Sequence, residues 1–153
     1  MHSIRVSSQK MSFSAAHFVV GADYFESLHG HNYTVEAIVS GPLDPNGMVM
    51  DFRDIKKQAV NVCSFLDHKV LLPENSESIT IEDKDISYDV SIGGKRYVFP
   101  KEDCMVLPFP ATTAELIAEY IAGELQLELN YSVKVCVSES LGSTGCYDAK
   151  GPQ

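Results

Sequence analysis

Three histidines in this chain have the spacing of a metal site. His29 and His31 are two positions apart, so on an extended strand their imidazoles point to the same face. Gly30 between them leaves no side chain where the backbone passes close to another group. His17 lies twelve positions before His29 and could supply a third nitrogen from a neighbouring strand. Three protein ligands and one open position are typical of a catalytic zinc, whereas a structural zinc usually has four protein ligands.

The cysteines offer no competing four-ligand site. They are far apart in the sequence and form no CxxC pair, so we expect four reduced thiols, at Cys63, Cys104, Cys136 and Cys146. A His-x-His pair on a strand also occurs as a surface or hydrogen-bonded pair, so a site without metal stays an alternative. Three imidazoles also suit several divalent metals besides zinc.

Length and composition predict one globular domain over residues 1–153. The chain has 44% hydrophobic residues, which suffices for a core, and no apolar run of the length that crosses a membrane. The first eleven residues are polar and mixed, so we expect a cytoplasmic protein with no membrane partner. The net charge of −9 argues against a nucleic-acid partner. An anionic substrate would need a local basic patch or a neighbouring subunit.

The first half of the chain predicts strands followed by a helix. Residues 3–19 indicate a strand pair or one bent strand, and residues 32–40 alternate between apolar and polar side chains, as a half-buried strand does. A dense turn signal follows at 41–47. Asp51 is a suitable N-cap for a helix over 52–66, in which apolar residues recur at spacings of three and four.

The second half predicts a hairpin, a helix and a strand. We expect a loop or weak strand over 74–85 and an extra hairpin with a Gly-Gly turn over 86–99. A capping box over 112–115 would start a second helix that ends near position 127. A strand over 132–139 and a loose, glycine-rich tail over 141–153 complete the chain. This order is typical of an α+β fold, in which two helices back a mainly antiparallel sheet.

Several separated motifs give the chain a family resemblance. It resembles the 6-pyruvoyltetrahydropterin synthase family, which includes the 6-carboxytetrahydropterin synthases. The matching motifs are FSAAH at 13–17, HGHNY at 29–33, LDPNGMVMDF at 43–52, LDH at 66–68, PATTAE at 110–115 and VSE at 137–139. The resemblance implies a tunnelling fold (T-fold), with a four-stranded antiparallel sheet backed by two helices. It also implies a homohexameric barrel, a dimer of trimers, with active sites between subunits.

The resemblance also assigns the metal and pterin ligands. It implies that Zn²⁺ binds three imidazoles, those of His17, His29 and His31. It implies that Glu139 anchors the pterin, because a carboxylate at a strand end can accept two parallel hydrogen bonds from the ring. Thr112 and Thr113 match a pair that lines the pterin pocket, and capping of the second helix is an equally open role for them.

A carboxylate–imidazole pair is implied as part of the catalytic machinery. Asp67 and His68 match a pair in which the carboxylate orients and polarises the imidazole. The alternative for this pair is a histidine that caps the C-terminus of the first helix.

One departure from the family pattern indicates the reaction. Relatives that make pyruvoyl or carboxy products have a catalytic cysteine shortly before the His-Gly-His motif, and this chain has no cysteine before Cys63. Glu26 stands three residues before His29, a pattern that resembles the type III branch of the family. That branch cleaves the side chain of 7,8-dihydroneopterin triphosphate to give 6-hydroxymethyl-7,8-dihydropterin for folate synthesis. A carboxylate suffices as the base, because a retro-aldol cleavage begins with loss of a hydroxyl proton.

Three other functions stay open at this point. The chain could be a 6-pyruvoyl- or 6-carboxytetrahydropterin synthase that has lost or moved its cysteine. It could be a non-catalytic protein that binds pterin or zinc, or a T-fold subunit without metal. Glu26 could also be a surface acid in a loop.

Overall fold

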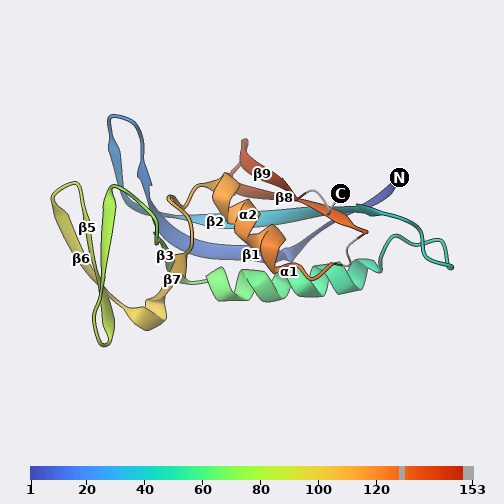
Figure 1. The fold of residues 1–153 in the computed structure, drawn as a ribbon, viewed down its shortest axis with the longest axis horizontal. Helices are drawn as coiled ribbons and strands as arrows, with labels where there is room; N and C mark the ends of the chain where they lie inside the picture. Colours follow the sequence, from blue (N-terminus) through green and yellow to red (C-terminus); the bar gives the residue numbers. More distant parts are fainter. Residues whose placement is uncertain (128–129, 150–153) are drawn as a thin grey trace.

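Two long antiparallel strands form the frame of the molecule. The computed structural model describes residues 1–127 and 130–149. The main sheet has six strands in the order β7-β3-β1-β2-β8-β9 (Figure 1). Their bounds are β1 His2–Val20, β2 Phe25–Gly41, β3 Lys69–Pro73, β7 Cys104–Leu107, β8 Ser132–Ser140 and β9 Ser143–Ala149. β1, β2, β8 and β9 pair antiparallel, and β3 and β7 add two parallel strands at one edge.

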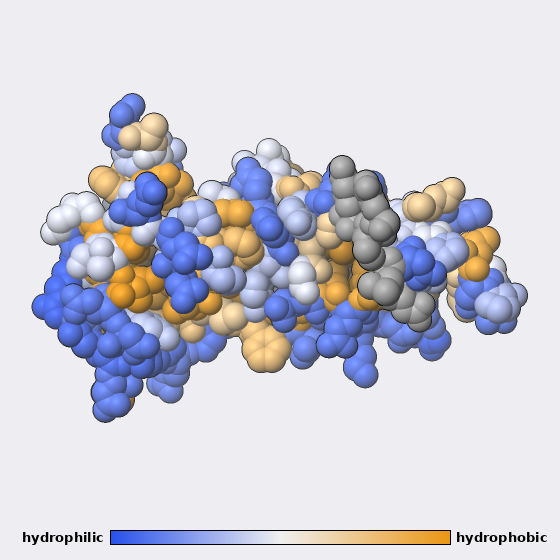
Figure 2. Space-filling model, viewed as in Figure 1, coloured by the Kyte–Doolittle hydropathy of each residue, from blue (hydrophilic) through white to orange (hydrophobic). Residues whose placement is uncertain are grey.

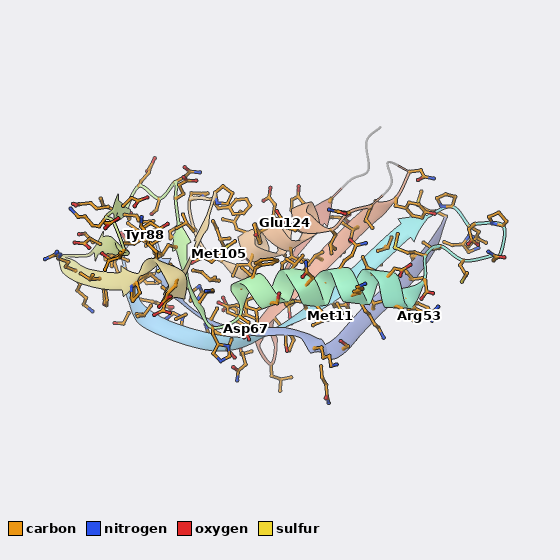
Figure 3. The ribbon with its side chains drawn as sticks, turned by 90° about the horizontal axis from the view of Figure 1, so that it is seen from below. Met11, Arg53, Asp67, Tyr88, Met105 and Glu124 are labelled. Atoms are coloured by element: carbon orange, nitrogen blue, oxygen red, sulfur yellow. A yellow bond between two sulfur atoms is a disulfide. The ribbon has the colours of Figure 1, made fainter. Side chains whose placement is uncertain are left out.

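Two helices cover one face of this sheet (Figure 1). α1 (Phe52–Leu66) has the predicted bounds, and the Asp51 side chain accepts a hydrogen bond from the Arg53 backbone N–H. Arg53 and Asp67 mark the two ends of α1 in Figure 3. α2 (Ala114–Glu124) ends three residues before the expected position 127. The α+β prediction with two helices on a mainly antiparallel sheet is therefore confirmed.

The alternation of β2 determines which side chains face the helices. Tyr33, Val35, Ala37 and Val39 are all buried and pack in the main core with the apolar stripes of α1 and α2. His29 and His31 have the same parity as these residues. They therefore continue the core face of β2 beyond the point where the packed apolar side chains end.

A second, three-stranded sheet lies at the end of the molecule where β1 turns into β2 (Figure 1). It consists of β4 (Ile79–Asp83), β5 (Ser87–Ile92) and β6 (Lys95–Pro100), all antiparallel. The hairpin expected over 86–99 forms as β5 and β6, and β4 takes part of the segment left open as loop or weak strand. Figure 2 shows apolar surface at this end of the molecule, beside hydrophilic surface at its outer edge.

The second sheet has its own small core. Phe18 of β1 and Leu72 of β3 are buried against three side chains of the second sheet, those of Ile79, Val90 and Ile92. Leu28 of β2 packs on the edge of this cluster. The second sheet therefore supports the segment of β1 and β2 in which His17 and His29 lie.

The N-terminal segment follows the expectation and the C-terminal segment does not. Residues 3–19 form the single bent strand that was one of the two expected forms, with a register shift between Ser7 and Ser12. The tail expected over 141–153 is not loose where it is described, because β9 pairs with β8 along its length. Its last four residues lie outside the described part of the chain.

The pairing of β8 with β9 also corrects the expectation of four reduced thiols. Cys136 and Cys146 stand opposite each other in the register and are joined by a disulfide. Their ten-residue separation gives no sign of this, because only the hairpin register brings them together. Cys63 and Cys104 are free.

None of the described helices is long and apolar enough to span a membrane.

Candidate active site

The three predicted histidines converge on one point. His17 stands opposite His29 in the β1–β2 register, and His31 follows two residues later on the same face of β2. One ring nitrogen from each of the three lies within 4.8 Å of the other two. The Nε2 atoms of His17 and His29 are 3.2 Å apart. A tetrahedral zinc with Zn–N bonds of about 2.0–2.1 Å would place two ligand nitrogens about 3.3 Å apart, so the spacing suits that ion.

Backbone carbonyls fix the tautomers of two of these imidazoles. His17 Nδ1 lies 2.8 Å from the Thr112 carbonyl oxygen, and His29 Nδ1 lies 2.7 Å from that of Ser27. A carbonyl oxygen can only accept, so each Nδ1 carries the hydrogen and donates it. Both Nε2 atoms are therefore left with free lone pairs, which is the usual outer-shell arrangement of metal-binding histidines.

We call His17, His29 and His31 the histidine triad. Burial favours the neutral, metal-binding form of its imidazoles. His17 is fully buried, and this desolvation lowers its pKa, which favours the neutral imidazole. His31 Nε2 is a buried polar atom that has no hydrogen-bond partner among the described residues. Such an atom is unfavourable unless a ligand meets it. The donor set, the tautomers and this unpartnered nitrogen all fit a divalent metal such as zinc.

Two carboxylates approach the triad at different histidines. Glu139 lies at the end of β8, and its two oxygens are each 3.9 Å from a ring Nε2, one of His17 and one of His31. Glu26 approaches the third histidine, with 3.7 Å between its Oε2 and the Nε2 of His29. Both predicted acids therefore reach the triad, and each contacts a different part of it.

These groups open into a cavity of about 440 Å³. Thr113, Glu26 and Glu139 line it, together with Ser143, Thr144 and Gly145 at the start of β9. Sequence reasoning missed the three β9 residues, because it assigned them to a loose tail. Only the pairing of β9 with β8 brings these residues to the cavity, and a local sequence pattern does not reveal that pairing.

The two threonines take different roles. Thr113 lines the cavity and is the N-cap of α2, where its hydroxyl accepts from the Leu116 N–H. The helix therefore starts one residue later than predicted, and the capping box of Thr112 with Glu115 does not form, because the residue three positions after the actual N-cap is Leu116. Thr112 is 1% exposed and lies behind His17, so in the single chain it holds the imidazole rather than lining the cavity.

Asp67 and His68 form their expected pair, but away from the triad. Asp67 Oδ2 lies 2.8 Å from His68 Nδ1, and the Ser14 backbone N–H donates to the other oxygen of Asp67. This N–H and the bond to His68 hold the pKa of Asp67 below its ordinary value.

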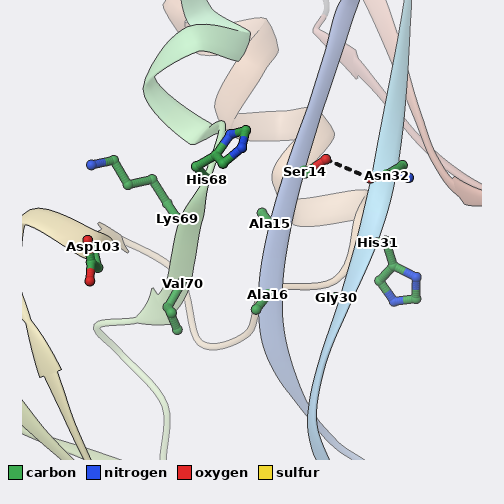
Figure 4. Close-up of a pocket in the computed structure, with 10 residues that line it drawn as sticks. All are labelled: Ser14, Ala15, Ala16, Gly30, His31, Asn32, His68, Lys69, Val70 and Asp103. Carbon is green, nitrogen blue, oxygen red and sulfur yellow. Dashed lines mark hydrogen bonds between the residues drawn. The ribbon is translucent and has the colours of Figure 1, made fainter.

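The imidazole of His68 faces a different opening. It lines a cavity of about 700 Å³ together with Lys69 and Asp103, and His31 of the triad lies at the opposite wall of the same cavity. In Figure 4 the His31 ring points away from His68, on the far side of β1 and β2. One chain therefore does not bring the pair together with the triad.

The sequence matches one protein family over nearly its whole length. The profile of the family described as 6-pyruvoyl tetrahydropterin synthase covers residues 6–150. The chain belongs to this family, whose members are pterin-processing lyases, and the resemblance inferred from the motifs is confirmed.

Three proteins to which this chain is similar differ in the function that their names give. A Methanocaldococcus jannaschii protein named putative 6-carboxy-5,6,7,8-tetrahydropterin synthase is 36% identical over 145 residues, covering 90% of this chain and 89% of that protein. A Pyrococcus furiosus dihydroneopterin monophosphate aldolase is 42% identical over 62 residues, covering 40% and 53%. The 6-pyruvoyl tetrahydropterin synthase structure from Plasmodium vivax has a TM-score of 0.91 at 30% identity, covering 97% and 98%. Two further structures of the Plasmodium protein replace a glutamate described as a catalytic residue.

Proposed function

We propose that the protein is a zinc-dependent lyase that cleaves the side chain of 7,8-dihydroneopterin triphosphate. The products are 6-hydroxymethyl-7,8-dihydropterin, a precursor for folate synthesis, and a phosphorylated two-carbon aldehyde. The observation that carries this proposal is the Glu26 carboxylate, 3.7 Å from the Nε2 of His29, where cysteine-dependent relatives have their base. The Plasmodium glutamate described as catalytic and the Pyrococcus aldolase support a carboxylate base and a cleavage reaction.

The thiols of this chain do not offer a replacement base. Within the described residues, no free cysteine lines the cavity of the triad. Cys63 is buried in the main core, where desolvation raises its thiol pKa to about 12. Cys136 and Cys146 are consumed by their disulfide. A pyruvoyl or carboxy synthase that depends on a thiolate is therefore disfavoured.

Glu26 would act as the general base of a retro-aldol cleavage. Its carboxylate accepts the proton of the hydroxyl on the second side-chain carbon. That carbon becomes the aldehyde as its bond to the first side-chain carbon breaks, and the electron pair is delocalised into the dihydropterin ring. Zinc held by the triad would lower the pKa of the side-chain hydroxyls. The first carbon then takes up a proton, which completes the hydroxymethyl group.

Glu139 would hold the pterin ring. Its carboxylate can accept two parallel hydrogen bonds, one from the 2-amino group of the pterin and one from the neighbouring ring N–H. Because the acceptor is ionised, both bonds would be charge-assisted and therefore strong. Thr113 shares the same cavity and offers a hydroxyl to the ring. Thr112 would act indirectly, because its carbonyl fixes the His17 tautomer.

The proton donor would come from a second subunit. His68 is exposed, with 84% of its side chain accessible, and faces the other cavity, while Asp67 orients it. In a homohexamer built as a dimer of trimers, this pair would complete the site of a neighbouring chain. Co-expressed Glu26→Gln and His68→Ala chains, each inactive alone, should then recover about a quarter of the activity after random equimolar mixing. Mixed oligomers without activity would count against a shared site.

Product analysis tests the reaction itself. The zinc-loaded protein is incubated separately with dihydroneopterin triphosphate and monophosphate, and the pterins are identified by mass spectrometry. We expect 6-hydroxymethyl-7,8-dihydropterin, and a loss of about 10²–10⁴-fold in kcat for Glu26→Gln, the usual contribution of a general base. Glu77→Gln, an exposed acid remote from the cavity, serves as the control. A pyruvoyl or carboxy product, or full turnover by zinc-loaded Glu26→Gln, would overturn the proposal.

A further inference from the structure

The hairpin of the second sheet touches the segment that carries Glu26. Its Gly93-Gly94 turn, with φ of 54° and 79°, lies against Phe25, because a Cβ built on Gly93 would be 3.2 Å from Phe25 Cδ2. Lys95 follows this turn, and its Nζ donates to the Ser27 hydroxyl at 3.4 Å. Glu26 and Lys95 line the same small cavity of about 90 Å³ between the two segments. Figure 1 shows this hairpin beside the β1–β2 turn.

Lys95 differs from three other cations that lie in the second sheet or directly after its strands. All three are neutralised by acids, in the ion pairs Arg96–Asp89, Lys84–Glu82 and Lys101–Asp83. Lys95 is exposed and is in none of the ion pairs formed between described residues. An ammonium group left without an acid beside an active site is free to meet an anion from solution.

Apart from the metal of the proposed function, the described residues that line the site cavity bring no positive charge to it. Three glutamates line it, Glu26, Glu115 and Glu139, and its lining includes no lysine or arginine. The whole chain has a net charge of −9. A ligand phosphate would therefore be repelled from the cavity unless a cation stands where the phosphate emerges.

The order of groups across the site places Lys95 at one end. Glu139 lies beside His17 and His31, whereas Glu26 lies beside the third histidine, His29. A substrate with its ring at Glu139 and its hydroxyls at the triad would direct the rest of its side chain past Glu26. Beyond Glu26 lie Ser27 and the ammonium group of Lys95.

We propose that Lys95 binds the phosphate of the substrate, so that the second sheet makes this site selective for phosphorylated pterins. The ring orientation in this inference rests on the proposed function. Lysine suits the task because its compact charge and three rotatable donors can follow a flexible phosphate chain. The Ser27 hydroxyl, already in contact with Lys95, is placed to donate to the same phosphate.

Binding of two oxidised pterins that differ only in phosphate tests this inference without requiring turnover. Dissociation constants of neopterin and neopterin triphosphate are measured by pterin fluorescence with the metal-loaded protein. We expect Lys95→Gln to weaken binding of the triphosphate by about fivefold or more, the scale of one partly exposed charge contact, and to leave neopterin binding unchanged. Lys95→Glu should weaken it further, and Lys95→Arg should retain it. The salt dependence of triphosphate binding should be shallower in Lys95→Gln than in the wild type.

The control is Lys10→Gln, which removes the same charge from an exposed β1 position remote from the triad. Equal weakening of both pterins by Lys95→Gln would mean that the lysine only supports the Glu26 segment, which overturns the inference. Unchanged triphosphate binding in Lys95→Glu would overturn it as well. These readouts are independent of the reaction, since a protein that binds the phosphate through Lys95 but releases a pyruvoyl product would refute the cleavage alone. A wild-type protein that binds neither pterin would refute both.

Discussion

Gly145 of β9 packs closely against the start of α2. A Cβ built on this residue would lie 2.5 Å from the backbone nitrogen of Glu115. It would also lie 2.8 Å from the carbonyl carbon and 2.9 Å from the Cβ of Ala114. Two of these three atoms are backbone, which a side-chain rotation cannot move. Gly145→Ala must therefore push α2 away from the sheet.

The expected loss of stability follows from this overlap. Forcing an extra carbon into a closely packed contact usually costs about 1–3 kcal/mol. In a chain of this size, each kcal/mol lowers Tm by about 2–4 °C, so we expect a decrease of about 2–12 °C. The same displacement acts on the site, because the residues just before α2 include Thr112, whose carbonyl holds the His17 ring. The affinity for zinc should therefore fall together with Tm.

Thermal unfolding at a fixed protein concentration, with and without zinc, measures both effects. The matched control is Gly123→Ala in α2, where an added Cβ meets no atom within 4 Å. Since alanine favours the helix, this variant should be stabilised by about 0.4–1 kcal/mol. If Gly145→Ala unfolded at the wild-type temperature and bound zinc with wild-type affinity, the reasoning from the β9–α2 contact would be wrong.

Three further predictions concern the cap, the acid pair and the metal. Thr113→Ala should destabilise the protein by about 0.5–1 kcal/mol in denaturant unfolding, the lower part of the usual range for an N-cap, because its bond to the Leu116 N–H is long at 3.4 Å. Asp67→Asn should lower Tm near neutral pH, because the Ser14 N–H depresses the pKa of Asp67 in the folded state. Because the pKa of Asp67 is lower in the folded state, its carboxylate stabilises the fold above about pH 4. The difference in Tm between the wild type and Asp67→Asn should therefore persist above about pH 4 and disappear as pH falls through the depressed pKa, which unfolding scans from pH 7 to pH 3 would show. Chelation should lower Tm, since zinc at about 100 times its Kd would stabilise the fold by about 2.7 kcal/mol, and a His17→Ala protein should show no response to the chelator.

The parts of the fold that local patterns determine could be predicted from the sequence. The apolar stripe and the Asp51 cap define α1 to the residue, and the alternation from Tyr33 to Val39 defines the buried face of β2. The triad followed from the same logic, because parity on a strand and pairing across a hairpin are short-range properties.

Features that depend on pairing between distant segments were beyond local reasoning. β9 contains Gly145 and little apolar alternation, so its strand conformation comes from β8 rather than from its own sequence. The disulfide of Cys136 with Cys146 has the same origin. The second sheet was visible as a hairpin, but its position beside Glu26 depends on a core built from β1, β3 and all three of its own strands.

The position of Asp67 and His68 shows what a motif leaves undecided. The pair was identified from sequence, but adjacency in the chain does not say which face of the sheet an imidazole will meet. The structure fixes His68 in a left-handed conformation, with φ of 60°, through a 2.7 Å bond from its backbone N–H to the Ser14 carbonyl. A non-glycine residue in this region is uncommon and somewhat strained, although histidine tolerates it better than most. Within one chain this exposed ring contacts Asp67 and faces an open cavity. These contacts do not explain how the cost of the strained conformation is offset in the stability of the single chain. The proposed role of this ring in a neighbouring subunit's site would account for the strained conformation.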